Sequence, residues 1–223
     1  MNRARPASPR LHRAAFIALG LIIAGFVGAY FHVSLRHVEG LREGEEALPV
    51  FGQVPDFRLK ERSGREVTLA DLRNQPWVVN LIFTSCPAAC GMMTTRMREV
   101  QEALRKTPEI KLVSITVDPE HDTPEVLAAY AERFLAKPAQ WWFLTGDAET
   151  IRRVAVEGLL MGFEETPPEE RERLGRFTHS TRFALVDGEG RVRGYYDSGT
   201  PRVVDDVVLG IGRLLREARK GVE

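Results

Sequence analysis

Residues 77–90, WVVNLIFTSCPAAC, decide the fold of this chain. Residues 77–84 form a nearly continuous apolar run that is rich in side chains favouring β-structure. Such a run is typical of a strand buried on both faces, so it predicts a strand inside a covered sheet. Both cysteines of the chain, Cys86 and Cys90, follow that strand directly.

A helix is predicted to begin at the cysteines. Apolar and sulfur-containing side chains recur at alternating intervals of four and three, at Cys86, Cys90, Met93, Met97, Val100 and Leu104. This spacing predicts one face of one helix. The cysteines then lie one turn apart with Cα atoms about 6 Å from each other, which a disulfide tolerates. Unpaired N–H groups at a helix start favour thiolate over thiol.

The cysteine pair therefore has several interpretations. It can be oxidised to a disulfide, or two thiolates can bind a soft metal ion such as Cu(I), with a neutral imidazole as a suitable further ligand. The alternative is that both are small buried residues that extend the apolar stripe, or that they form a permanent structural disulfide.

The rest of the chain predicts an α/β protein. Strands are expected at 56–59, 66–69, 111–118 and 141–144, helices from 123 and over 148–156, and a hairpin of 181–186 with 192–196 before a last helix from 201. Strands that alternate with helices and end in a hairpin and a helix predict an α/β sandwich. Residues 162–176, GFEETPPEERERLGR, interrupt this pattern as a solvated surface loop or, because they end beside His179, as a mobile flap or docking loop.

The N-terminus predicts a membrane anchor. Residues 14–31 carry no charge and reach about 27 Å as a helix at ~1.5 Å per residue, close to the ~30 Å hydrocarbon core. Four arginines within 1–13 predict that this end stays in the cytoplasm. We expect a cytoplasmic segment 1–13, a transmembrane anchor 14–31, a tether 32–50 and a folded domain 51–221. A cleaved signal peptide is the alternative.

Composition excludes several classes of protein. The chain has 223 residues, of which 43% are hydrophobic and 28% charged, which excludes collagen, low-complexity disorder and polytopic membrane proteins. Residues 36–223 carry 27 basic and 31 acidic side chains. This mildly acidic body argues against nucleic acid as a partner. An exported domain lies where disulfides can form.

Among the five histidines, His179 is the best candidate metal ligand. It lies in Thr178-His179-Ser180, just before a strand expected to enter the same sheet edge as the cysteines; a capping role is the alternative. His121 is interpreted as a surface residue, and Met93 as a core residue on the apolar stripe. Met92 lies off that stripe, and its role is left open.

Three motifs together resemble the Sco/SenC family. Residues 83–90, FTSCPAAC, resemble the family's FT-x-C-P-x-x-C motif, and 118–124, DPEHDTP, resemble its DPxxDTP segment. The segment Thr178-His179-Ser180 before FALVD is similar to its histidine-serine motif. The resemblance spans roughly residues 50–218. One departure is Gly91, where the family usually has a second proline.

The resemblance implies a thioredoxin-like fold, a central mixed sheet flanked by helices. It also implies a copper chaperone, bound to the inner membrane with its domain in the periplasm, that helps to assemble the dinuclear copper site of cytochrome c oxidase. Cys86, Cys90 and His179 would bind Cu(I), and also Cu(II). Asp118 and Asp122 would orient the loop or contact the partner, with helix-start capping by Asp122 or Thr123 as the alternative.

The expected partners are the copper-site subunit of the oxidase and another copper chaperone as donor. The function expected is that of a metallochaperone with no catalytic residue. The alternative is a thiol–disulfide oxidoreductase that uses Cys86 and Cys90 as a redox-active disulfide to reduce cysteines of the oxidase subunit. A CxxxC spacing in place of CxxC, and the presence of His179, argue against that alternative. A peroxidase or a copper sensor is a further alternative.

Overall fold

The computed structural model describes residues 47–87 and 90–220, together with Gly25 and Gly28. The predicted anchor 14–31 therefore lies outside the described residues, except for those two glycines, which are helical. Among the helices that are described, none combines the length and the apolar character needed to cross a bilayer. The folded unit begins at Ala47. Leu48, at the end of the predicted tether, is held there by its carbonyl, which accepts from the Arg193 guanidinium, and by its N–H, which donates to Glu217.

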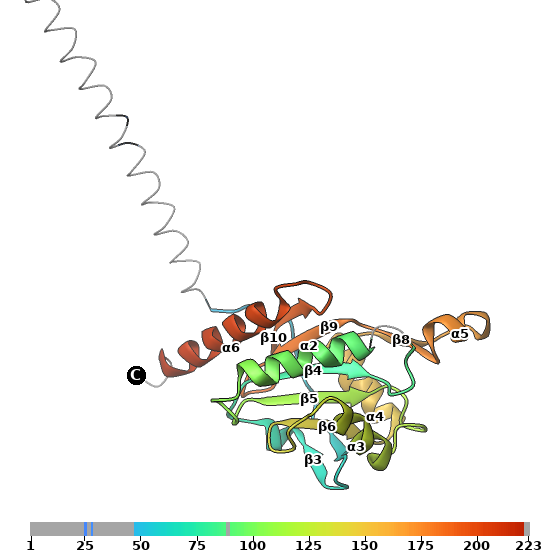
Figure 1. Cartoon of the computed structure of the whole chain (residues 1–223). Coiled ribbons are helices and arrows are strands. Elements are labelled where there is room, and N and C mark those ends of the chain that lie inside the picture. Colours follow the sequence, from blue (N-terminus) through green and yellow to red (C-terminus); the bar gives the residue numbers. More distant parts are fainter. Residues whose placement is uncertain (1–24, 26–27, 29–46, 88–89, 221–223) are drawn as a thin grey trace, which may run out of the picture. The chain divides into compact units, whose positions relative to one another are not determined.

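A mixed sheet forms the centre of this unit (Figure 1). In the described part of the chain its eight strands are ordered β1-β10-β9-β4-β5-β6-β2-β3. Their bounds are β1 Gly52–Gln53, β2 Arg58–Glu61, β3 Glu66–Thr68, β4 Trp77–Ile82, β5 Lys111–Thr116, β6 Trp141–Thr145, β9 Arg182–Val186 and β10 Arg191–Asp197. β4, β5 and β6 run parallel, and β9 pairs antiparallel with β4.

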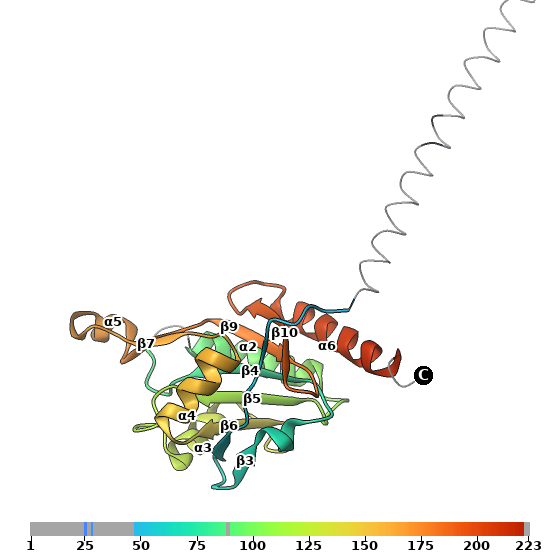
Figure 2. The same cartoon turned by 180° about the vertical axis from the view of Figure 1, so that it is seen from behind.

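The central strand β4 is buried over its whole length, as its apolar run predicts. Its side chains alternate between two hydrophobic clusters, one on each face of the sheet. The first face packs against α4 (Ala148–Arg152) and the π-helical turn η2 (Arg153–Gly158) (Figure 2). The second packs against α2 (Cys90–Ala103), α3 (Pro124–Arg133) and α6 (Val203–Lys220) (Figure 1). The predicted α/β architecture is confirmed.

Two local predictions need correction. The helix predicted to include both cysteines begins at Cys90, and Cys86 lies before it, outside any helix or strand, between a turn at Thr84 and Ser85 and a bend at Pro87. The apolar stripe does continue through Met93, Met97 and Val100, all fully buried. Cys86 matches the spacing of this stripe in the sequence but does not belong to it in the structure. It packs against the hydrophobic cluster on the opposite face of the sheet from Met93, Met97 and Val100.

Residues 162–176 form more than a loop. Their first part is strand β7 (Phe163–Glu165), which pairs antiparallel with β8 (Phe177–His179) in a separate two-stranded sheet. The connection contains two short helical turns, η3 (Pro168–Glu170) and α5 (Arg171–Leu174). This β7–β8 hairpin extends from the body beside the end of β4 (Figures 1 and 2). Short strands and single helical turns leave little periodicity in the sequence, which explains why the hairpin was not predicted.

Candidate metal centre

The cysteine loop, of which the structure describes residues 83–87, leaves the sheet at the end of β4 and leads to Cys90. The chain turns at Thr84 and Ser85, and the backbone N–H of Cys86 donates to the carbonyl of Phe83 at 3.3 Å. Cys86 is half-buried against the core cluster that contains Phe83. Cys90 is the first residue of α2, and its side chain lies outside the described part of the chain. The loop therefore places Cys86 at the carboxyl edge of the parallel strands.

His179 is the last residue of β8 and lies half-buried beside this loop. Its ring stands edge-on to the ring of Phe83, with centroids 5.7 Å apart. Its Nδ1 atom lies 2.9 Å from the carbonyl oxygen of Ser180. A carbonyl only accepts, so Nδ1 carries the proton and Nε2 carries the lone pair that a metal ion requires. Burial lowers the pKa of His179, although the Ser180 carbonyl partly opposes this effect. The neutral imidazole is therefore favoured.

Phe83 and Gly175 join the cysteine loop to the β7–β8 hairpin. Phe83 lies three residues before Cys86 and contacts both His179 and Phe177, the two ends of β8. Gly175 adopts a φ of +83°, and a Cβ atom there would lie 2.8 Å from the Phe83 ring and 2.9 Å from Pro87 Cδ. The hairpin thus approaches the cysteine loop so closely that a side chain at position 175 does not fit.

Asp122 holds the start of the cysteine loop through hydrogen bonds. It is fully buried and accepts hydrogen bonds from the backbone N–H of Thr84 at 3.1 Å and from the hydroxyls of Thr84 and Thr116. Thr84 belongs to the cysteine loop, and Thr116 is the last residue of β5. Asp122 therefore ties the ends of two parallel strands together. The cap of α3 is Thr123, whose side chain accepts from the N–H of Val126.

Asp118 holds the hairpin. Its carboxylate, only 2% exposed, accepts from the guanidinium of Arg176 at 3.0 Å. Arg176 also donates to Glu120 at 2.7 Å, lies 3.8 Å from Glu165, and stacks over the ring of Phe177. Burial raises the pKa of Asp118, and the Arg176 guanidinium opposes that shift. The loop after β5 thus contacts the cysteine loop through Asp122 and the hairpin through Asp118.

The remaining predicted residues lie as follows. Met93 is a fully buried core residue, as predicted, whereas Met92 is 46% exposed. His121 is exposed, which agrees with its interpretation as a surface residue. Among the side chains that the structure describes, no three histidines, cysteines or carboxylates form a group suited to a metal ion. Cys90 is not part of that set, so the full ligand set stays a prediction.

Two residues that position the site were not singled out from the sequence. Phe83 belongs to the quoted cysteine motif, but its contact with His179 spans 96 positions of the chain. Arg176 lies among other charged residues of the interruption, where nothing distinguishes it from Arg171 or Arg173. Only the pairing of β7 with β8 shows which arginine faces Asp118.

Comparison with known proteins identifies the family. A model of the SCO1/SenC family matches residues 49–208, which include the cysteine loop, both aspartates and His179. The chain belongs to the SCO1/SenC family. This membership confirms the resemblance carried by the three motifs.

Relatives of this SCO1/SenC protein include a protein of Bacillus subtilis and two solved structures. The SCO1 protein homolog of Bacillus subtilis is 27% identical over 165 residues, which cover 73% of this chain and 83% of the relative. BsSco, described as a cytochrome c oxidase assembly protein with a disulfide switch, is 26% identical with a TM-score of 0.65, and the match covers 76% of this chain and 98% of its own. Yeast Sco1 with copper bound is 26% identical with a TM-score of 0.58, and the match covers 74% of this chain and 90% of yeast Sco1.

Proposed function

We propose that this SCO1/SenC protein binds copper through Cys86, Cys90 and His179 and delivers it during assembly of the dinuclear copper site of cytochrome c oxidase. The observation that carries the proposal is the pairing of His179 with the cysteine loop. Phe83 lies between the two, and the Ser180 carbonyl fixes the tautomer in which Nε2 carries the lone pair. Two relatives support it: yeast Sco1 has been solved with copper bound, and BsSco is described as an oxidase assembly protein.

The donor set suits Cu(I). Thiolates are soft ligands that select Cu(I), and imidazole is compatible with both Cu(I) and Cu(II). The lowered pKa of His179 keeps its imidazole neutral, so no proton competes with the metal there at neutral pH. The thiols must lose their protons on binding, so we expect the affinity for Cu(I) to fall as the pH falls.

Competition for Cu(I) against a chromophoric chelator tests the proposal. We expect the reduced full-length chain to bind one Cu(I), and His179→Ala and Cys86→Ser each to weaken binding by more than about 100-fold, because even the loss of an outer contact costs about 10- to 100-fold. His121→Ala is the matched control, since His121 is an exposed histidine, and should leave the affinity unchanged. Equal affinities of His179→Ala and His121→Ala would exclude His179 as a ligand.

Thiol–disulfide exchange is a second candidate function, favoured by the disulfide switch described for BsSco. One thiolate of the Cys86/Cys90 pair would attack a disulfide of the oxidase subunit, forming a mixed disulfide and releasing one thiolate of that subunit. The other cysteine would then release the second thiolate and leave a Cys86–Cys90 disulfide, so two electrons pass to the subunit. Thiol counting on both proteins after mixing would detect this transfer. It should be unaffected by His179→Ala, unlike copper delivery.

We also propose that residues 14–31 anchor the domain to the inner membrane with its folded part in the periplasm. The uncharged run of 14–31 and the arginines before it support this topology. Protease added to spheroplasts should remove the folded domain, and N-terminal sequencing of the native protein should begin near Met1. A mature N-terminus close to residue 30 would instead indicate a cleaved signal peptide.

A further inference from the structure

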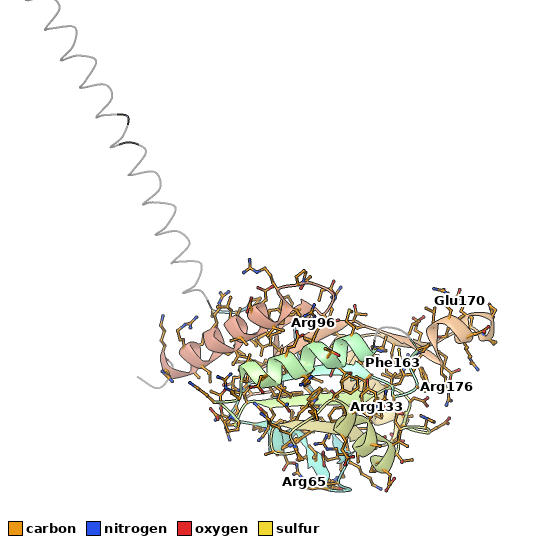
Figure 3. All side chains as sticks on the ribbon, in the orientation of Figure 1. Arg65, Arg96, Arg133, Phe163, Glu170 and Arg176 are labelled. Atoms are coloured by element: carbon orange, nitrogen blue, oxygen red, sulfur yellow. The ribbon has the colours of Figure 1, made fainter. Side chains whose placement is uncertain are left out.

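A cavity of about 330 Å³ opens beside the β7–β8 hairpin. Its walls come from the loop after β5, from α4 and from both strands of the hairpin. Ile151, Phe163 and Phe177 provide an apolar floor, with Ile151 and Phe177 buried. Phe163 and Arg176, which both line the cavity, lie at the base of the hairpin, whereas Glu170 lies at its outer end (Figure 3). The volume is at the lower end of the range of sites that bind small ligands.

The rim of this cavity is acidic. Five carboxylates line it against two guanidinium groups: Asp118, Glu120, Glu149, Glu164 and Glu165 against Arg152 and Arg176. Arg176 is already neutralised by its contacts with Asp118, Glu120 and Glu165. Glu149 and Glu164 are exposed and form no ion pair with any residue in the described part of the chain. Arg152 is likewise exposed and forms no ion pair among the described residues, so the five carboxylates and two guanidinium groups together leave the rim with a net charge of −3, which attracts positive charge.

We infer that the cavity is the docking site for a lysine- or arginine-bearing segment of the protein that receives the copper, an inference that rests on the proposed function. Lysine and arginine bury an aliphatic stem against apolar surface while the charged head stays at the rim. In this cavity the stem packs on Phe163 and Ile151, and the head lies near Glu149 and Glu164. An acidic segment is rejected, because it would face carboxylates of the same charge.

The cavity lies next to the elements that carry the predicted copper ligands. Phe177, in its floor, contacts Phe83 of the cysteine loop with ring centroids 6.1 Å apart. Phe163 is the register partner of His179 across the hairpin. A segment seated there lies against the hairpin that carries one predicted copper ligand and beside the loop that carries the others. Docking raises the local concentration of the recipient's own ligands, which speeds exchange of the metal.

The test compares two double variants of the full-length chain with equal net charge. Glu149→Gln/Glu164→Gln neutralises the open rim, whereas Glu109→Gln/Glu157→Gln removes two exposed carboxylates outside the cavity. The probe is the purified soluble copper-site domain of the cytochrome c oxidase subunit, and its Kd is measured by surface plasmon resonance without copper. We expect the rim variant to bind roughly tenfold more weakly than the wild type, with a smaller dependence on salt. The control variant should differ from the wild type by less than about twofold.

Competition for Cu(I) on the same proteins separates this inference from the proposed function. Both double variants should keep the Cu(I) affinity and melting temperature of the wild type, because the neutralised carboxylates are exposed and are not predicted ligands. Equal Kd values for the rim and control variants would overturn the docking inference and leave the copper site standing. Absence of tight Cu(I) binding in the wild type would overturn the proposed function, while the Kd comparison without copper would still decide on the cavity.

Discussion

The cysteine loop and the β7–β8 hairpin meet at one site but are held in different ways. The cysteine loop is fixed by a fully buried carboxylate, Asp122, which accepts from the backbone and from two threonine hydroxyls. The hairpin is fixed by Arg176, whose side chain is 37% exposed and whose partners are carboxylates. Buried hydrogen bonds between neutral donors and a carboxylate respond little to salt, whereas half-exposed ion pairs weaken with salt and acid.

This difference indicates a rigid half of the site, the described residues 83–87 of the cysteine loop, and an adjustable half, the β7–β8 hairpin. The cysteine loop continues from β4, which is buried and paired with strands on both sides. The hairpin has only two short strands paired with each other, and its connection is exposed. The proposed transfer of a metal ion would benefit from one fixed part and one that opens at low cost. The following changes test that comparison.

Asp122→Ala should have the largest effect on folding. Its removal leaves the half-buried N–H and hydroxyl of Thr84 and the buried hydroxyl of Thr116 without their acceptor. At about 1–3 kcal/mol for each unsatisfied buried group, we expect the free energy of unfolding to fall by about 4 kcal/mol. Urea denaturation measures it. Asp56→Ala, at an exposed aspartate, is the control and should cost less than about 0.5 kcal/mol. Similar losses of stability for both variants would contradict the claim that Asp122 fixes the cysteine loop.

Gly175→Ala should have an intermediate effect and act on the contact between the two halves. A Cβ at 175 would clash with Phe83 and Pro87, in addition to its cost at a φ of +83°. We expect a loss of about 2–3 kcal/mol in stability and a weaker affinity for Cu(I). Gly64→Ala is a matched control, because Gly64 has a φ of +84° and nothing within 4 Å of its Cβ position. Gly64→Ala should lose only the stability that the positive φ costs, and it should keep its Cu(I) affinity. If Gly175→Ala behaved in the same way, the close approach of Gly175 to Phe83 and Pro87 would not be needed for the site.

Arg176→Met should have the smallest effect, and one that depends on pH. The pKa of Asp118 is already raised, so the folded state holds the proton of this carboxyl more firmly than the unfolded state does. The free energy of unfolding therefore falls as the pH rises from the usual aspartate pKa through the raised one. Without the guanidinium that pKa rises further. We expect a loss of about 1 kcal/mol in the free energy of unfolding near neutral pH, which shrinks as the pH falls and Asp118 is protonated.

Denaturation measures this change for Arg176→Met and for Arg96→Met at about pH 7, well above the usual carboxylate pKa of about 4, and at about pH 4, close to it. Arg96 pairs with Glu99, whose side chain is 45% exposed against 3% for Asp118, so the loss for Arg96→Met should be smaller at both pH values. An Arg176→Met penalty that stayed constant with pH would show that the pair with Asp118 does not hold the hairpin.

Much of the fold could be predicted from local pattern. The apolar run of 77–84 predicts the buried β4, because a strand covered on both faces needs apolar side chains in both directions. Thr123 followed by Pro124 predicts the start of α3, where the structure has its cap. The π-helical turn η2 and the true start of α2 were not predicted, because both depend on how the chain meets the core rather than on the spacing of apolar residues.

The sequence by itself determined the family, the α/β class and the residue types that predict a metal site, because these follow from short motifs and from periodicity. Only the tertiary structure decided how the motifs cooperate. Asp122 reaches Thr84 across 38 positions, Arg176 reaches Asp118 across 58, and Phe83 reaches His179 across 96. Such contacts depend on the order of the strands in the sheet and on the placement of the hairpin. Neither is encoded in the spacing of neighbouring residues, so side chains that look alike in the sequence, such as Arg173 and Arg176, acquire different roles.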